Sequence, residues 1–283
     1  MRRRSCLVVL VFLSALAAVH AQTTDFLTLV KTATPQNVQD ALDKGASVKA
    51  IDSVGRTPLM MAAEYNPDPA VVRALLTAGA DINAQDTCGG NCLFYATGKP
   101  LDVVTMLLSF GADPNAGSSD GETPFMNAAS HTSNPEEIAA LLKAGADINS
   151  RDTNGLTPLM YAAAGSKSTE VIAALLKAGA DINARDLGSR TALMLAAKSN
   201  PMPEVVQALL DAGSAVESRD LMGRSALMIA AGANNPRVVI ALLKAGGDCK
   251  AKDKADKTAF DYARSNYGLQ GTDAYRQLKE ASQ

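Results

Sequence analysis

The sequence contains no tryptophan and only two histidines, one of which, His20, lies close to the N-terminus. His131 is then the one histidine in the rest of the chain, so neither a Ser–His pair with a metal nor a histidine-rich site can be assembled. Lys and Arg together number 27 against 29 Asp and Glu, and no basic block follows residues 2–4. Without such a block the chain lacks the charge that binds a phosphate backbone, so we expect no nucleic-acid partner.

No apolar run reaches the roughly 20 residues that a membrane-spanning helix needs. Residues 7–19 are apolar except for Ser14, and they follow three arginines at residues 2–4. With small or apolar side chains ending at Ala21, this layout is typical of a secretory signal peptide. We therefore expect residues 1–21 to be removed before Gln22, leaving an exported chain without stable membrane insertion.

The sequence also lacks any Asn-x-Ser/Thr glycosylation acceptor, a feature that fits a bacterial envelope protein. Together with the predicted signal peptide, this favours a periplasmic location, with secretion as the alternative. At 47% hydrophobic and 20% charged residues, the rest of the chain has the composition of an ordered globular protein.

What the chain has in abundance is a repeat of about 34 residues, which is the first feature to establish because it decides the fold. Thr157-Pro158-Leu159 has close or looser copies that begin at residues 57, 91, 123, 191, 225 and 258. A second set of equivalent positions holds glycine throughout: Gly45, Gly79, Gly111, Gly145, Gly179, Gly213 and Gly246. These motifs closely resemble the ankyrin-repeat family, with Met in place of the usual His after Thr-Pro-Leu.

Each repeat has the local signals of two helices. Thr157 is suited to cap the first helix and Pro158 to occupy its first turn. Val171, Ile172 and Leu175 lie on one apolar face of the second helix, which a following glycine ends. A single unit cannot bury its own apolar faces, so neighbouring units must stack. The sequence predicts an all-α ankyrin-repeat solenoid of about eight units including caps, joined by β-hairpin-like fingers.

We predict one ankyrin-repeat domain over residues 22–283, after the signal peptide. An N-cap spans 22–53, regular repeats span 54–254, and a more polar C-cap spans 255–283. Helices are expected at 24–30 and 35–44 in the N-cap, and at 258–265 and 272–281 in the C-cap. Polar outer faces at both ends keep such a stack soluble.

Three stretches carry possible chemistry. Residues 117–121 match the Gly-x-Ser-x-Gly string of hydrolases, but they align with finger turns and not with a strand–turn–helix. Cys88 and Cys92, four residues apart around Gly-Gly, are open to three interpretations: a structural disulfide, free thiols, or a redox or metal role. The methionines at one repeated position are expected to pack in the core: Met60, Met126, Met160, Met194 and Met228. We expect no enzyme and no cofactor or metal, unless Ser119 or the cysteine pair proves active.

The resemblance implies protein binding on a concave surface made by finger tips and first helices. The positions it assigns to that surface are Val54, Arg56, Asp120, Glu122, Leu156, Leu187, Arg190, Leu221, Met222 and Arg224 at the tips, and Glu64, Tyr65, Lys99, Ser130, His131 and Lys198 on the helices. Four of them, Leu156, Leu187, Leu221 and Met222, are large apolar residues expected to face water, which would form a patch suited to binding. The sequence thus predicts a monomeric protein-interaction scaffold in the periplasm, or alternatively a secreted effector that acts on another cell.

Overall fold

The computed structural model describes residues 25–200, 202–233 and 235–282. The predicted signal peptide and its cleavage site lie outside the described residues. Within the described ranges every regular element is a helix and no residue is in a strand, as the predicted all-α fold requires. No helix of these ranges is both long enough and apolar enough to cross a bilayer.

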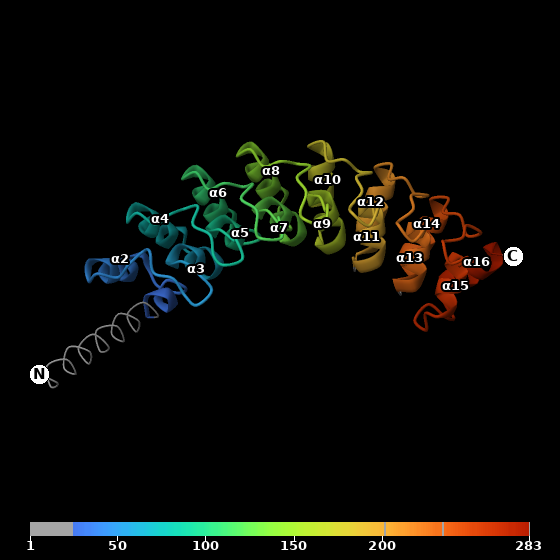
Figure 1. Ribbon diagram of the computed structural model, residues 1–283, viewed down its shortest axis with the longest axis horizontal. Helices are drawn as coiled ribbons and strands as arrows, with labels where there is room; N and C mark the ends of the chain where they lie inside the picture. The colour runs from blue at the N-terminus through green and yellow to red at the C-terminus, as the bar shows by residue number, and fades with distance from the viewer. Residues whose placement is uncertain (1–24, 201, 234, 283) are drawn as a thin grey trace, which may run out of the picture. The chain divides into compact units, whose positions relative to one another are not determined.

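The chain divides into two compact units between Ser119 and Asp120. In the first unit, a helical turn at residues 25–29 precedes α2 (Pro35–Asp43), α3 (Pro58–Tyr65), α4 (Pro69–Thr77), α5 (Cys92–Ala96) and α6 (Leu101–Ser109). Helix α3 packs against α5 in one layer, and α2, α4 and α6 pack in succession in a second layer (Figure 1).

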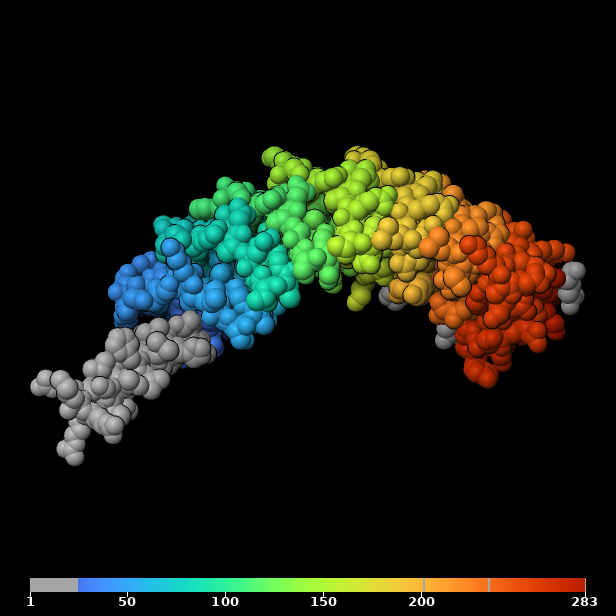
Figure 2. Space-filling view, in the orientation of Figure 1, coloured from blue at the N-terminus to red at the C-terminus, as the bar shows by residue number. Residues whose placement is uncertain are grey.

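The second unit repeats this arrangement over five helix pairs. Its helices are α7 (Pro124–His131), α8 (Pro135–Lys143), α9 (Pro158–Gly165), α10 (Thr169–Lys177), α11 (Ala192–Ser199), α12 (Pro203–Asp211), α13 (Ala226–Ala233), α14 (Pro236–Lys244), α15 (Ala259–Arg264) and α16 (Asp273–Ala281). The odd-numbered first helices form one layer and the even-numbered second helices form the other. In Figure 2 the colours of this unit run in order from green to red, so repeats that are neighbours in sequence are neighbours in space.

The helix ends form where the sequence predicts them. The hydroxyl oxygen of Thr157 accepts the backbone N–H of Met160 over 3.4 Å, and Pro158 occupies the first turn of α9. After α10, Gly179 has φ of +94°, a backbone conformation that a glycine adopts without strain. The predicted solenoid units, including the helix pairs of both caps, are confirmed. The predicted outer bounds of the domain and its caps stay a prediction.

The core consists of the apolar stripes of consecutive helices. Val171, Ile172 and Leu175 of α10 are fully buried. The methionines of the repeated position are also buried, as expected: Met60, Met126, Met160, Met194 and Met228. No group of His, Cys, Asp or Glu among the described residues is arranged to hold a metal ion.

Buried asparagines join repeats across the turn between the two helices of a pair. Nδ2 of Asn200 donates to the carbonyl oxygens of Ala163 and Ser166, both at 2.9 Å. Nδ2 of Asn66 donates in the same way to two carbonyls, 33 and 36 residues earlier in the chain. Nδ2 of Asn266 donates to one carbonyl, 35 residues earlier. Each of these side chains satisfies buried carbonyl groups of the preceding repeat, and therefore fixes one helix pair to the next.

The fingers between repeats are hydrogen-bonded turns. In one of them the N–H of Asp152 donates to the carbonyl of Leu156 over 3.1 Å, a hairpin-like closure without strands. Adjacent fingers are joined by a single backbone bond, as from Leu221 N–H to the Gly188 carbonyl at 3.0 Å. The finger tips are therefore held in a fixed register along each unit.

Candidate functional site

The largest exposed apolar side chains of the second unit include three on two adjacent finger tips. Leu187 is 71% exposed, Leu221 56% and Met222 58%. All three were assigned to the expected surface from the sequence. Leu156 was assigned with them but is half-buried. It stands four residues after Asp152, so it matches Arg190, which stands four residues after Asp186, and not the exposed Leu187. We call Leu187, Leu221 and Met222 the tip patch.

Arginines on the fingers fix the backbone beneath the tip patch. Nη1 of Arg185 donates to the carbonyl of Ser189 in its own finger, at 3.1 Å, and to that of Arg219 in the next, at 2.8 Å. Arg151 and Arg219 make the same pair of contacts in their fingers. The matching positions of the first unit hold Ile51, Gln85 and Gly117 instead. The exposed tips of the second unit are thus built on rigid turns.

Two further predicted residues, Arg190 and Arg224, are anchored by buried carboxylates. Nε of Arg190 lies 2.6 Å from Oδ2 of Asp186, whose side chain is fully buried. Nε of Arg224 donates to Oδ2 of Asp220 over 2.9 Å. Each aspartate also accepts the backbone N–H of its arginine, at 2.7 and 2.8 Å. The finger geometry therefore determines where both guanidinium groups lie.

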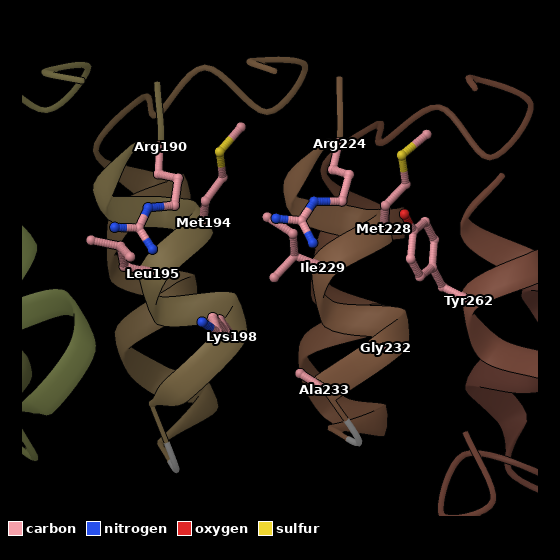
Figure 3. Close-up of a pocket in the computed structure, with 10 residues that line it drawn as sticks. All are labelled: Arg190, Met194, Leu195, Lys198, Arg224, Met228, Ile229, Gly232, Ala233 and Tyr262. Carbon is pink, nitrogen blue, oxygen red and sulfur yellow. The ribbon is translucent and has the colours of Figure 1, made fainter. Parts of the chain in front are cut away.

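Below these arginines the first helices line an open pocket of about 410 Å³ (Figure 3). Its described lining residues are Arg190, Met194, Leu195, Lys198, Arg224, Met228, Ile229, Gly232, Ala233 and Tyr262. Figure 3 shows the guanidinium groups of Arg190 and Arg224 at equivalent places beside α11 and α13, near Leu195 and Ile229 respectively. The structure thus brings together three predicted site residues, Arg190, Lys198 and Arg224, over an apolar floor.

Part of this floor was not among the residues expected from the sequence. Leu195, Ile229 and Tyr262 occupy one repeated position, directly after the buried residue of the Met series or its equivalent. In other repeats that position holds Met61, Tyr95, Asn127 or Tyr161. Aliphatic residues in two consecutive repeats, where three of the four other repeats have a polar or aromatic residue, were the signal that could have identified the floor.

The predicted residues of the first unit are not among the described residues that line the pocket. Nε of Arg56 pairs with Oδ2 of Asp52 at 2.9 Å, and its Nη1 lies 3.7 Å from Glu64. The bond to Asp52 is the main cause that raises the pKa of Arg56. Tyr65 is exposed and has Lys31 Nζ 5.1 Å from its ring centroid. Val54 and Lys99 are also exposed, on the finger and on the turn after α5.

Four predicted residues lie at the start of the second unit. Asp120 and His131 are exposed, and Nδ1 of His131 lies 3.0 Å from the Asn127 carbonyl. Glu122 is half-buried. Burial is the main cause that raises its pKa; His131 opposes this, and Asp152 and Asp120 add to it. Ser130, near them on α7, is half-buried. These side chains lie outside the pocket.

The predicted disulfide between Cys88 and Cys92 is not formed in the structure, where both thiols are free. Cys88 is exposed on the finger, whereas Cys92 begins α5 and is buried, with Sγ 3.0 Å from the Ile82 carbonyl. The two side chains therefore lie in different environments. Burial raises the pKa of Cys92 to about 12, which is the opposite of what a redox-active thiol needs.

The hydrolase-like string lies in a finger turn, as its alignment with the other repeats indicates. Ser119 is exposed, and its N–H donates to the Cys88 carbonyl over 2.7 Å. A nucleophile elbow needs a strand before the serine, and residues 112–118 contain none. The string therefore has the geometry of a finger and not of a catalytic turn.

Comparison with known proteins identifies the repeat. A family model described as ankyrin repeats (3 copies) matches residues 27–118, 93–186 and 187–275, and another, described as ankyrin repeats (many copies), matches residues 163–210. Ankyrin repeat domain-containing protein 63 of Homo sapiens is 42% identical over 98 residues, which cover 33% of this chain and 25% of that protein. B-cell lymphoma 3 protein homolog of Mus musculus is 34% identical over 137 residues, covering 46% and 30% respectively.

A third relative is SH3 and multiple ankyrin repeat domains protein 1 of Homo sapiens, 33% identical over 124 residues, which cover 42% of this chain and 6% of that protein. The chain therefore aligns with less than a third of the length of each of these relatives. The likeness concerns the repeats.

Proposed function

The chain belongs to the ankyrin-repeat family, and on that premise we propose that it is a non-catalytic scaffold that binds another protein through the tip patch and the adjoining pocket. Ankyrin repeats mediate protein–protein interaction in general. The observation that carries the proposal is the exposure of Leu187, Leu221 and Met222 on adjacent fingers. Contiguous apolar side chains on a soluble surface are typical of an interaction site.

The rigidity of the fingers supports the same surface. Arg185 and Arg219 bond across neighbouring fingers, and Leu221 N–H bonds to Gly188. A patch whose backbone is already ordered loses little conformational entropy when a partner binds, which favours affinity. The comparable fingers of the first unit lack these arginines, so we place the principal contact on the second unit.

We further propose that the protein is exported and works as a monomer in a bacterial periplasm. The support is the sequence of residues 2–21, with three arginines, a short apolar stretch and a small residue before Gln22. Release into the medium, where the protein would act on another cell, is the alternative. N-terminal sequencing of the exported product tests the cleavage, and cell fractionation separates the two locations.

A crosslinked capture experiment tests the binding function. Tagged mature protein is used as bait in envelope and medium fractions, and captured proteins are identified by mass spectrometry. A partner captured by the wild type should be lost with Leu187→Ser/Leu221→Ser. The matched control is Tyr267→Ser, because Tyr267 is 87% exposed on the C-terminal cap, away from the patch. Equal capture by all three proteins would contradict the proposed surface.

A further inference from the structure

We propose that the pocket between α11 and α13 receives an extended acidic peptide segment, with two carboxylates three residues apart and a large apolar residue between them. This inference rests on the proposed binding function and specifies the chemistry of the partner. It is carried by the cationic side chains of the pocket, Arg190, Arg224 and Lys198, over an apolar floor.

The described lining of the pocket carries positive charge. None of its described lining residues is acidic, although the whole chain has a net charge of −2. The carboxylates of Asp186 and Asp220 that anchor the arginines lie behind them, with side chains 0% and 2% exposed. Lys198 is exposed in the last turn of α11 and forms no ion pair with a described residue. The accessible surface of the pocket is therefore positive.

Both arginines keep N–H donors that their aspartates do not use. Arg190 contacts Asp186 through Nε, so the N–H groups of its two terminal nitrogens are available on the pocket side. Arg224 uses Nε and Nη2 for Asp220, at 2.9 and 2.8 Å, and keeps Nη1. Guanidinium groups held in place by a buried acid bind a second carboxylate without first losing rotamer freedom.

The spacing of the arginines selects the segment. Arg190 and Arg224 occupy the same position in consecutive repeats, whose first helices α11 and α13 pack side by side. Packed helices lie about 8–10 Å apart. In an extended polyproline-type peptide, side chains three residues apart point the same way and are separated by about 9.3 Å. Two carboxylates at such positions match the two arginines.

The floor accounts for the apolar residue between the acids. Leu195 and Ile229 line the pocket beneath the guanidinium groups, over the buried Met194 and Met228. The pocket is lined by the small residues Gly232 and Ala233 on α13, whereas the long side chain of Lys198 lines it on α11. A leucine-sized side chain at a middle position of the peptide would bury its surface against this floor.

The test uses a labelled peptide, Gly-Asp-Leu-Pro-Asp-Gly, and its diamide analogue, Gly-Asn-Leu-Pro-Asn-Gly, with binding followed by fluorescence polarisation. The mature protein should bind the acidic peptide at least tenfold more tightly than the analogue. Because both contacts are ionic, raising the salt to about 0.5 M should reduce this preference. Equal affinity for the two peptides would overturn the inference.

Two variants of the protein locate the binding. Lys198→Glu reverses the unpaired charge and should weaken peptide binding at least tenfold. The control is Lys177→Glu, at an exposed lysine in the last turn of α10, which should change the affinity less than twofold. Gly232→Met narrows the mouth without changing charge and should weaken binding similarly. A Cβ at Gly232 meets only Tyr262, at ordinary contact distance of 3.7 Å, so the backbone of α13 accepts a side chain at this position. Unchanged affinity in both pocket variants would place the peptide elsewhere.

Failure of this inference is distinguishable from failure of the proposed function. If the capture experiment returns a partner that depends on Leu187 and Leu221 while the acidic peptide shows no preference, the scaffold function stands and the pocket chemistry is wrong. If neither a patch-dependent partner nor the peptide binds, both proposals are wrong.

Discussion

The hydroxyl of Tyr161 donates a hydrogen bond to Oδ2 of Asp152 over 3.0 Å, from the first helix of a repeat to its own finger. Other fingers use an arginine for the same task, as Arg190 does for Asp186. The tyrosine pairs are Tyr95–Asp86, Tyr161–Asp152 and Tyr262–Asp253, and the arginine pairs are Arg56–Asp52, Arg190–Asp186 and Arg224–Asp220. Each of these six aspartates thus accepts a side-chain hydrogen bond from either a tyrosine or an arginine.

Removal of the tyrosine hydroxyl should destabilise the repeat. In Tyr161→Phe the Oδ2 atom of the buried Asp152 loses its side-chain donor, and hydrogen bonds to charged groups contribute about 1.5–3 kcal/mol. Urea unfolding measures the loss. Tyr267→Phe serves as the control, because Tyr267 is almost fully exposed and should leave the midpoint unchanged. Equal midpoints for the two variants would show that the contact contributes nothing.

A core truncation in the middle of the second unit tests the helix faces. Leu175 of α10 is fully buried, so Leu175→Ala should cost about 2–5 kcal/mol of unfolding free energy. Its neighbour Leu176 is half-buried, and Leu176→Ala should cost clearly less. The two variants differ by one position in sequence, and a reversed order of their unfolding midpoints would contradict the packing described.

The finger arginines should control local opening. Arg185→Met keeps the length of the side chain but removes its donors to Ser189 and Arg219, so the backbone bond from Leu221 to Gly188 should open more often. Amide hydrogen exchange of Leu221 should become several-fold faster. Arg237→Met, which removes only a surface pair with Glu204, should leave that exchange rate unchanged. Slow exchange in both proteins would rule out a rigidifying role.

Acid should weaken the contact between Tyr262 and Asp253. Burial alone raises the pKa of Asp253, but the hydrogen bonds from Tyr262 and from the Lys257 and Ala255 amides outweigh it and hold the pKa below the ordinary aspartate value of 3.8. A lowered folded-state pKa gives stability that is present above the unfolded-state pKa and is lost as pH falls through the folded-state value.

The stability gap between wild type and Tyr262→Phe should therefore be widest near neutral pH and should narrow below pH 3.8. Urea midpoints measured from pH 6 to pH 2 give this gap directly. A gap that stays constant over the whole range would show that Tyr262 does not act through the ionised form of Asp253.

Thiol labelling distinguishes the cysteines. At pH 8 a disulfide-exchange reagent should modify Cys88 quickly, because it is exposed. Cys92 and Cys249 are buried, and burial raises the pKa of both, so they should react only after unfolding. Mass spectrometry of the labelled protein identifies the sites. Absence of labelling at Cys88 in native protein, with recovery after reduction, would instead support the disulfide expected from the sequence.

The stack could be predicted because each signal is local and repeated. Thr157, Pro158 and Gly179 define helix ends through their own backbone preferences, and 34-residue periodicity supplies the rest. Exposure in the fingers could not be predicted as safely, because it depends on the place within the finger: Leu187 directly follows Asp186 and is exposed, whereas Leu156 stands four residues after Asp152 and is half-buried. The floor residues Leu195 and Ile229 look like core in sequence, and only the stacking of α11 on α13 shows that they line a pocket.

The buried bonds of Asn66, Asn200 and Asn266 reach back one repeat and no further. Asn66 reaches its two acceptor carbonyls over 36 and 33 residues and Asn200 over 37 and 34, so a repeat can gain or lose one residue and keep this contact. Duplication or deletion of a whole repeat also keeps every such contact. The binding surface can therefore be lengthened or shortened in steps of about 34 residues.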